Sequence, residues 1–426
     1  MTGPAAMPAR SEPARSEPAP SEPAPSEPAP SEPAPSDEER LARAALTYLA
    51  EPGDSVLGAL LAVCEPAEVL ATIKADTLPG VLGTASRAVL ERALGRWRTR
   101  LPRLPADGEF ADACRDGIRL VCPGDAEWPG ALDRLGPARP YALWLRGNAD
   151  LRFACSRSVS VVGSRAATSY GGHVAGELSA DLAERGWAVV SGGAYGIDAA
   201  AHRGALAAEG VTIAILACGV DYPYPAGHAD LFAAICAQGL VASEWPPGSR
   251  PARTRFLIRN RVIAALSGGT VIVEAGERSG ALNTARHAAE LGQPLMAVPG
   301  PVTSAQSAGC HRIIREWSAA CVTRATEIIE LLSPLSVPDA LAPDVHGPGA
   351  QGLGALSPSD DGPCRDDLDI DSARVLDALP ARGGAGTSTI AVEAGVDLDT
   401  VLRCLGQLAG LGFIERCDRG WRLRKH

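Results

Sequence analysis

The chain has 426 residues, a length that suggests two to four domains, and 46% of them are apolar, which is enough for a sizeable core. The net charge of −10 excludes a generally basic, histone-like binder, so any nucleic-acid site must be a local patch. The only two lysines, Lys74 and Lys425, do not follow a glycine, which excludes the phosphate-binding loop of P-loop ATPases.

None of the eleven cysteines forms a C-x-x-C pair, so the sequence has no zinc-ribbon or thioredoxin signature. We therefore expect neither a metal nor a cofactor. An apolar leader and a run of about 18 apolar residues are both missing, which argues against secretion and membrane spanning. Free thiols in a cytoplasmic protein are the expected state of the cysteines.

Residues 11–35 consist of five pentapeptides, SEPAR once and then SEPAP four times. Frequent proline prevents a helix and the repeats have little to bury, so residues 1–37 are predicted to be a disordered tail. Through Arg40 the chain holds eight acids and three arginines, which is half of its net charge. We interpret the tail as a solvated spacer.

Helical periodicity begins after the tail. Leu41, Leu46 and Leu49 recur at helical spacing, and residues 38–104 are predicted to form a small helical domain. Prolines and glycines over residues 102–130 then indicate a connecting stretch.

From about Ser158, short apolar segments alternate with helical ones, as in a parallel sheet with helices on both faces. The expected strands are 158–162, 187–191, 211–216, 240–243, 270–274 and 295–298. The expected helices are about 171–185, 197–209, 228–238, 258–267, 280–292 and 325–332. Residues 105–332 are therefore predicted to be an α/β domain with an extended Rossmann-like, doubly wound sheet.

Residues 333–369 are rich in Pro, Gly, Ser and Asp and are predicted to be a linker. Over residues 370–426 the patterns predict helices at 373–379, 387–394 and 398–409, then strands at 413–415 and 421–423, which is the order of a winged helix. Its recognition helix has a single basic residue, Arg403, which favours a protein contact or supporting role. An accessory DNA role stays open through the basic residues at the end: Arg416, Arg419, Arg422, Arg424 and Lys425.

Two glycine-rich turns follow the first two expected strands, at the sheet edge where such folds bind ligands. Free N–H groups of a turn and a helix start can hold phosphate, an arginine adds a bidentate ligand, and a tyrosine offers bases a stacking surface. The alternative is a tight turn with a solvent-exposed arginine. The residues assigned to this site are Gly163, Ser164, Arg165, Ser191, Gly192, Gly193, Tyr195 and Gly196.

Five arginines fall within residues 250–261, and no acid interrupts them. Such a run with an aromatic residue inside it favours a track for the backbone of single-stranded nucleic acid plus a stacking platform. A solvated charged face is the alternative. Besides Arg250, the run contains the residues assigned to binding: Arg253, Arg255, Phe256, Arg259, Asn260 and Arg261.

Further candidates surround the two turns. Ser279 and Gly280 open an expected helix and are assigned to phosphate binding, and Glu274 ends the preceding strand. Glu274 has two open roles, as a general base or as a cap of free N–H groups at that helix start. Asp198 is expected to cap or bias its helix, and His202 is interpreted as a structural helix histidine.

Six strings occur in register: VSVVGSRAATSYG, VVSGGAYGIDAAAHRGAL, TIAILACGVDYPYPAGH, SEWPPG, RNRVIAALSGGTVIVEAGERSGALNTA and MAVPG. Together they resemble the DNA-processing protein A family (DprA, also called Smf) over about residues 120–330. The resemblance implies binding of single-stranded DNA without catalysis, a homodimer, and loading of the RecA recombinase during natural transformation and recombination. The residues before this region look like the sterile-alpha-motif-like part of many members.

By position, Arg165 corresponds to the phosphate-gripping arginine of that family, and Arg259 and Arg261 belong to its RNR string. Tyr195 stands where many members have a lysine, and residues 303–312 depart from the usual Gly-Ser-Asn-rich segment. Two alternative functions are a nucleotide-processing enzyme using Glu274 and a regulator that binds duplex DNA through the winged helix.

Overall fold

The computed structural model describes residues 34–75, 84–105, 117–333, 368–379, 384–417 and 420–424. The expected tail lies outside these residues except for 34–37, and the expected linker lies outside them except for 333 and 368–369. Arg419 and Lys425 are outside them as well. In the ranges just given, no helix is both long and apolar enough to cross a membrane.

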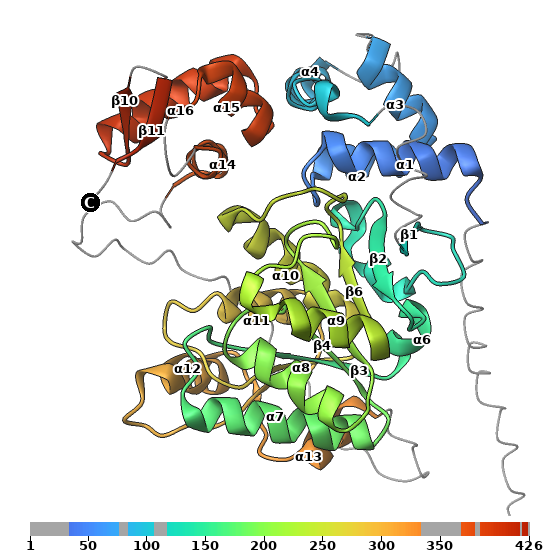
Figure 1. Cartoon of the computed structure of the whole chain (residues 1–426), viewed down its shortest axis with the longest axis vertical. Coiled ribbons are helices and arrows are strands. Elements are labelled where there is room, and N and C mark those ends of the chain that lie inside the picture. The colour runs from blue at the N-terminus through green and yellow to red at the C-terminus, as the bar shows by residue number, and fades with distance from the viewer. Residues whose placement is uncertain are drawn as a thin grey trace, which may run out of the picture. The chain divides into compact units, whose positions relative to one another are not determined.

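The helices and strands are named in chain order (Figure 1). The α-helices are α1 (Asp37–Leu49), α2 (Ser55–Leu61), α3 (Pro66–Ala75), α4 (Thr84–Arg98), α6 (Leu151–Ser156), α7 (Ser169–Glu184), α8 (Ile197–Ala207), α9 (Ala229–Gln238), α10 (Arg253–Leu266), α11 (Ala281–Glu290), α12 (Ala308–Glu316), α13 (Ala325–Leu332), α14 (Ile370–Asp377), α15 (Thr387–Ala394) and α16 (Leu398–Gly410). The 3-10 helices are η1 (Leu101–Arg103), η2 (Gly130–Ala138), η3 (Ala226–His228) and η4 (Ala305–Ser307). The strands are β1 (Ile118–Val121), β2 (Leu143–Gly147), β3 (Ser158–Val162), β4 (Ala188–Ser191), β5 (Thr212–Leu216), β6 (Leu240–Ser243), β7 (Thr270–Ile272), β8 (Leu295–Ala297), β9 (Ala320–Cys321), β10 (Ile414–Cys417) and β11 (Gly420–Leu423).

The main sheet has nine strands in the order β1-β2-β6-β5-β4-β3-β7-β8-β9. The strands from β6 to β9 in that order pair in parallel, whereas β2 pairs antiparallel with both β1 and β6. The expected α/β fold class is confirmed. After β6 the chain returns to the other side of β3, so β3 and β7 flank the switch point where sheets of this kind bind ligands.

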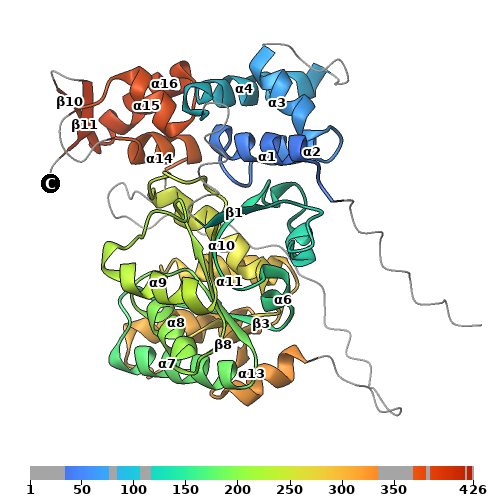
Figure 2. The same cartoon turned by 45° about the vertical axis from the view of Figure 1, so that its right-hand side comes forward.

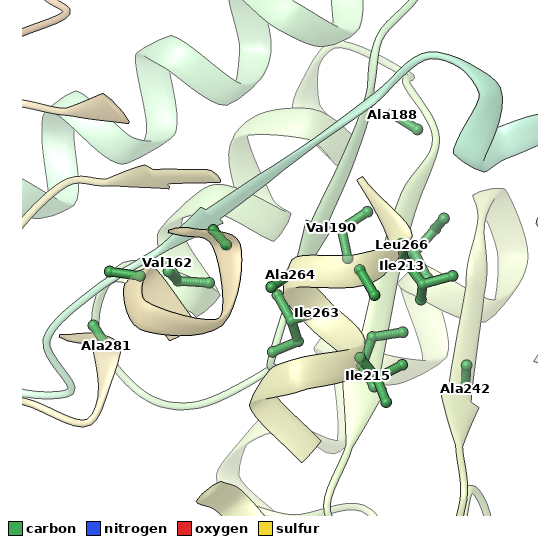
Figure 3. Close-up of a cluster of buried hydrophobic side chains, with 14 of the residues drawn as sticks. Val162, Ala188, Val190, Ile213, Ile215, Ala242, Ile263, Ala264, Leu266 and Ala281 are labelled. Atoms are coloured by element: carbon green, nitrogen blue, oxygen red, sulfur yellow. The ribbon is translucent and has the colours of Figure 1, made fainter. Parts of the chain in front are cut away.

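The alternation of side chains along the strands explains the two cores. Val190, Ile213 and Ile215 point to one face, where they meet Ile263 and Leu266 of α10 (Figure 3). The intervening strand residues point to the opposite face, where α7, α8, α9 and α13 pack against them. Both faces are covered, which is why each strand reads as a continuous apolar run.

The structure also contains elements that the sequence patterns did not predict. β1, β2 and α6 occupy the stretch before Ser158, which has no alternating apolar pattern long enough to mark strands, and α12 follows β8. Helix α10 begins at Arg253, several residues before the expected start at about 258. Its first turns are rich in arginine, a good helix former that gives no apolar periodicity.

Helices α7 and α8 lie side by side in both views (Figures 1 and 2). Their backbones approach at two glycines: a Cβ atom added at Gly204 of α8 would lie 2.1 Å from the carbonyl oxygen of Gly176 in α7. Only a residue without a side chain fits there. This close packing supports the turns that precede both helices.

We expect Gly204→Ala to lower the free energy of unfolding by about 1–3 kcal/mol, because the added methyl group overpacks the contact between α7 and α8. Gly172→Ala is the matched control, since a Cβ atom there meets nothing within 4 Å and alanine is the better helix former by about 0.5–1 kcal/mol. Urea denaturation measures both. Equal stability of the two variants would contradict the close approach.

Candidate functional site

A cavity of about 1410 Å³ opens at the carboxyl ends of β3 and β7. Its wall includes the turn after β3, the first half of α10 and the start of α11, together with residues of the α1–α2 connection, α4 and α14. Most of the predicted site residues meet here although they are far apart in the sequence. Those that line the cavity are Gly163, Ser164, Arg165, Arg253, Phe256, Arg259, Asn260, Arg261, Ser279 and Gly280.

Planar side chains gather at one end of this cavity. The guanidinium carbon of the exposed Arg165 lies 4.6 Å from the ring centre of Phe256, and the ring of Tyr224 lies 5.8 Å from the same centre. Tyr195 is 52% exposed and meets the ring of His228 edge-on. Arg165, Tyr195, Tyr224 and Phe256 also border a second, smaller cavity of about 50 Å³.

The two glycine-rich turns are packed against each other. Gly196 has a positive φ of 78°, and a Cβ atom there would lie 2.3 Å from the Ser164 carbonyl oxygen. The Ser164 amide donates to the Glu274 carbonyl at 2.7 Å, next to Gly163. Gly163 and Gly196 therefore allow the two turns to approach each other closely. On the sequence alone, these glycines were assigned to a turn whose free N–H groups bind phosphate.

The remaining members of the second turn face inward. Ser191 is fully buried and its hydroxyl donates to the Val161 carbonyl at 2.7 Å. A Cβ atom at Gly193, where φ is 71°, would lie 2.7 Å from the Phe232 ring, and one at Gly192 would lie 2.6 Å from Arg259. Of the assigned residues in this turn, Gly192 and Tyr195 reach the smaller cavity, whereas Ser191, Gly193 and Gly196 border neither.

Arg259 is 4% exposed and its guanidinium group serves the interior of the protein. It donates to the carbonyl oxygens of Gly192, at 2.8 Å, and of Ile215. Burial lowers the pKa of Arg259 to about 10, and the neighbouring Asp198 opposes that shift. Asp198 accepts a hydrogen bond from the Ala194 amide, and burial raises its pKa. This pair fastens the turn after β4 to α10, so Asp198 does not cap α8 with its side chain as the sequence suggested.

Arg261 is likewise buried, and it forms a bidentate ion pair with Glu244 in which both N–O distances are 2.6 Å. Its Nε donates to the carbonyl oxygen of Ala138 at 3.1 Å. The predicted exposed track of five arginines is therefore wrong at Arg259 and Arg261, because the carbonyl and carboxylate groups of the fold already occupy their donors. Arg250 and Arg253 are the exposed members of the run.

Arg255 is engaged by a buried carboxylate. Glu51 accepts from Arg255 at 3.1 Å, from Arg100 at 2.6 Å and from the indole of Trp245 at 2.9 Å. Burial would raise the pKa of Glu51, but Arg255 and Arg100 outweigh it and hold that pKa well below its usual range. Arg255 does not border the cavity, and the contact that the structure gives it is with Glu51.

The start of α11 remains open toward the cavity. Asn260 is 8% exposed, and its amide donates to the Gly280 carbonyl at 3.3 Å, which positions this helix start. The Ser279 hydroxyl accepts from the Ala281 amide at 3.3 Å. A Cβ atom at Gly280 would meet nothing within 4 Å, so the space in front of this turn is free of protein atoms.

Glu274 points to a different helix from the one expected. Its carboxylate accepts from the Thr168 amide at 2.9 Å and from the Thr168 hydroxyl at 2.5 Å, so it braces the start of α7 and does not border the cavity. His202 is fully buried, with its Nδ1 2.7 Å from the Thr212 hydroxyl, as the structural interpretation predicted. Burial lowers the pKa of His202 to about 3.

Four of the arginines that line the cavity were missed in the sequence analysis. Arg278 precedes α11, Arg286 lies within α11, Arg96 comes from α4 and Arg374 from α14. Arg278 precedes the predicted Ser279 by one residue, which was a usable signal. No sequence signal marked Arg96, because only the folded chain brings α4 to this cavity.

Three comparisons with known proteins agree on one family. The family model of DNA recombination-mediator protein A matches residues 119–333. A Mycobacterium tuberculosis protein named as a DNA processing protein DprA is 43% identical over 397 residues, which cover 91% of this chain and 95% of that protein. The DNA processing protein DprA of Bacillus subtilis is 32% identical over 262 residues, covering 60% and 86% respectively. The crystal structure of DNA processing protein A from Streptococcus pneumoniae superposes with a TM-score of 0.54 at 29% identity, covering 69% of this chain and 97% of that one.

We expect Arg261→Ala to lower the free energy of unfolding by about 3–5 kcal/mol, because it leaves the buried Glu244 carboxylate without its partner. The double variant Glu244→Leu with Arg261→Met removes both charges and should regain most of this loss. Chemical denaturation measures each variant. A single variant as stable as the unmodified protein would contradict a structural role for Arg261.

Proposed function

The chain belongs to the DNA recombination-mediator protein A family, and on that premise we propose that it binds single-stranded DNA without making or breaking a covalent bond. The observation that carries the proposal is the exposed guanidinium group of Arg165, stacked over Phe256 at the edge of the large cavity. A cation and an aromatic face in one place suit a polymer of phosphates and unpaired bases.

The charge around the cavity supports phosphate binding. Eight arginines and four aspartates line it, although the whole chain has a net charge of −10. Arg165, Arg278 and Arg286 are exposed at the wall of the cavity, within reach of a phosphate backbone, and Arg286 also lies 3.9 Å from Glu290. Arg259 and Arg261 contribute positive potential and hold the wall in place, and direct contacts fall to the exposed members. Ser164, Ser279 and Gly280 add polar groups beside them.

The aromatic end supports binding of unpaired bases. Tyr195, Tyr224 and Phe256 surround the smaller cavity, and each presents a ring face or edge on which a base can stack. Bases in a duplex are already stacked on each other, so this feature favours single strands. Ring faces and phosphate contacts carry little sequence information, and we infer weak sequence preference.

The surroundings of Glu274, the one carboxylate considered as a general base, and of the neighbouring Asp198 support binding rather than catalysis. Glu274, the alternative general base, is committed to Thr168, and Asp198 is committed to Ala194 beside Arg259. An acid–base role needs a group within reach of the substrate, and Glu274 does not border the cavity. Delivery of the bound strand to RecA, assembly as a homodimer and a role in natural transformation belong to the same proposal and are implied by the family resemblance.

We expect Arg165→Ala combined with Phe256→Ala to weaken binding of a fluorescent single-stranded oligonucleotide by about tenfold or more, since a stacked base alone contributes about 1–3 kcal/mol. Fluorescence anisotropy at several salt concentrations should show a slope of log affinity against log salt that is smaller by about 0.7 for the lost phosphate contact.

Arg324→Ala is the matched control, because this exposed arginine precedes α13 and does not border the cavity. It should bind the oligonucleotide as the unmodified protein does. Wild-type affinity of the double variant at moderate salt would overturn the proposed site, and tighter binding of a duplex than of a single strand would overturn the substrate class.

A further inference from the structure

Helix α10 begins without a cap of its own. Its N-cap residue is Ala252, which has no side-chain acceptor, and its first turn contains no acid. The missing acceptor comes from α14: the Asp377 carboxylate accepts from the Thr254 amide at 3.0 Å and from the Thr254 hydroxyl at 3.2 Å. The positive end of α10 is thus occupied by a carboxylate from a segment more than 100 residues further along the chain.

The same helix α14 forms part of the wall of the large cavity. Asp371 and Asp377 are two of the four aspartates that line it, together with Arg165 and Phe256 of the proposed binding site. The other two aspartates belong to the main body of the fold, where Asp198 is paired inside the protein. Helix α14 therefore brings half of the lining carboxylates into a cavity whose arginines suit phosphates. Its own Arg374 lies 3.9 Å from Asp371, which leaves Asp377 as the carboxylate directed at α10.

The C-terminal segment (residues 368–424) has a core of its own. Val375, Leu376, Ile390, Leu405 and further residues of this segment form one apolar cluster, and within the described residues that cluster includes none from before residue 368. A unit with its own core does not depend on its neighbour for stability. Such a unit can leave its contact surface while remaining folded.

The contacts of this segment with the rest of the chain include a partly exposed ion pair and a buried hydrogen bond. Arg103 of η1 lies 2.5 Å from Glu393, and the neighbouring Arg100 donates to the Ala394 carbonyl at 3.2 Å. The Glu393 side chain is 57% exposed, so water can replace its partner at small cost. An exposed ion pair such as Arg103–Glu393 separates and re-forms more readily than a shared apolar core.

We propose that the C-terminal segment is an intramolecular competitor of the nucleic acid, in which α14 occupies the end of α10 and a bound strand displaces it. This inference rests on the proposed binding of single-stranded DNA. A phosphate and the Asp377 carboxylate seek the same donors at Thr254 and carry the same sign of charge. The docked segment therefore lowers the affinity for DNA, and loosening it raises that affinity.

The Arg103–Glu393 pair permits a sharp test, because neither residue borders the cavity. In the full-length protein, Arg103→Glu places a second carboxylate beside that of Glu393, and their repulsion loosens the C-terminal segment. We expect about two- to fivefold tighter binding of labelled oligo(dT), the size that follows from an exposed ion pair. The change of net charge alone predicts weaker binding, since this variant is two charges more negative and DNA is an anion.

Glu393→Arg should also bind more tightly, and the double variant Arg103→Glu with Glu393→Arg should return to wild-type affinity because the pair is restored with its charges exchanged. Unchanged or weaker binding by Arg103→Glu would overturn the proposal. So would a double variant whose affinity for oligo(dT) does not return to that of the unmodified protein. If the unmodified protein and all variants fail to bind single-stranded DNA, it is the proposed function that fails.

Hydrogen exchange gives an independent measurement. Amides of α14 should exchange faster in the full-length protein when oligo(dT) is added, while those of α7 and α8 stay unchanged. Slower exchange in α14 would mean that the helix closes over the strand as part of the binding site, and would overturn competition.

Discussion

The buried guanidinium group of Arg259 is the contact on which the arrangement of the site depends. It joins α10 to the carbonyl oxygens of Gly192 and Ile215, at the ends of β4 and β5. Because Phe256 precedes Arg259 by three residues, it lies on the same face of the helix, one turn nearer the open end. Fixing Arg259 therefore fixes the ring on which Arg165 stacks. A guanidinium group bonded to carbonyl oxygens of the fold thus positions the exposed side chains of the site.

The arginines of the chain divide into two kinds that composition does not distinguish. Arg259 and Arg261 are enclosed, and protein oxygen atoms satisfy their donors. Arg165 and Arg278 are exposed and line the cavity. A net charge of −10 is compatible with a positive cavity because eight arginines and only four aspartates line it. Local placement, and not the total charge, determines what the surface can bind.

The sequence predicted the parallel strands well, because each is a short apolar run between glycine-rich turns. It missed β1 and β2, where the apolar pattern is too short to mark a strand. The position of Arg165 at a strand end was evident from its turn, but the burial of Arg261 was not, since Glu244 lies 17 residues away in another element. Contacts between distant elements, such as Arg96 at the cavity, leave no local pattern to find.

Glu51 shows a further consequence of these long-range contacts. One carboxylate serves Arg100 and Arg255, and Arg100 in turn reaches the backbone at Ala394. Replacing Glu51 leaves both arginines without their shared carboxylate, and replacing either arginine removes one of the two cations that stabilise it. Such positions should change together during evolution, as a linked set that spans the N-terminal helices, α10 and the C-terminal segment. Paired substitutions at these positions among relatives would then indicate that these parts contact each other, independently of any measurement of DNA binding.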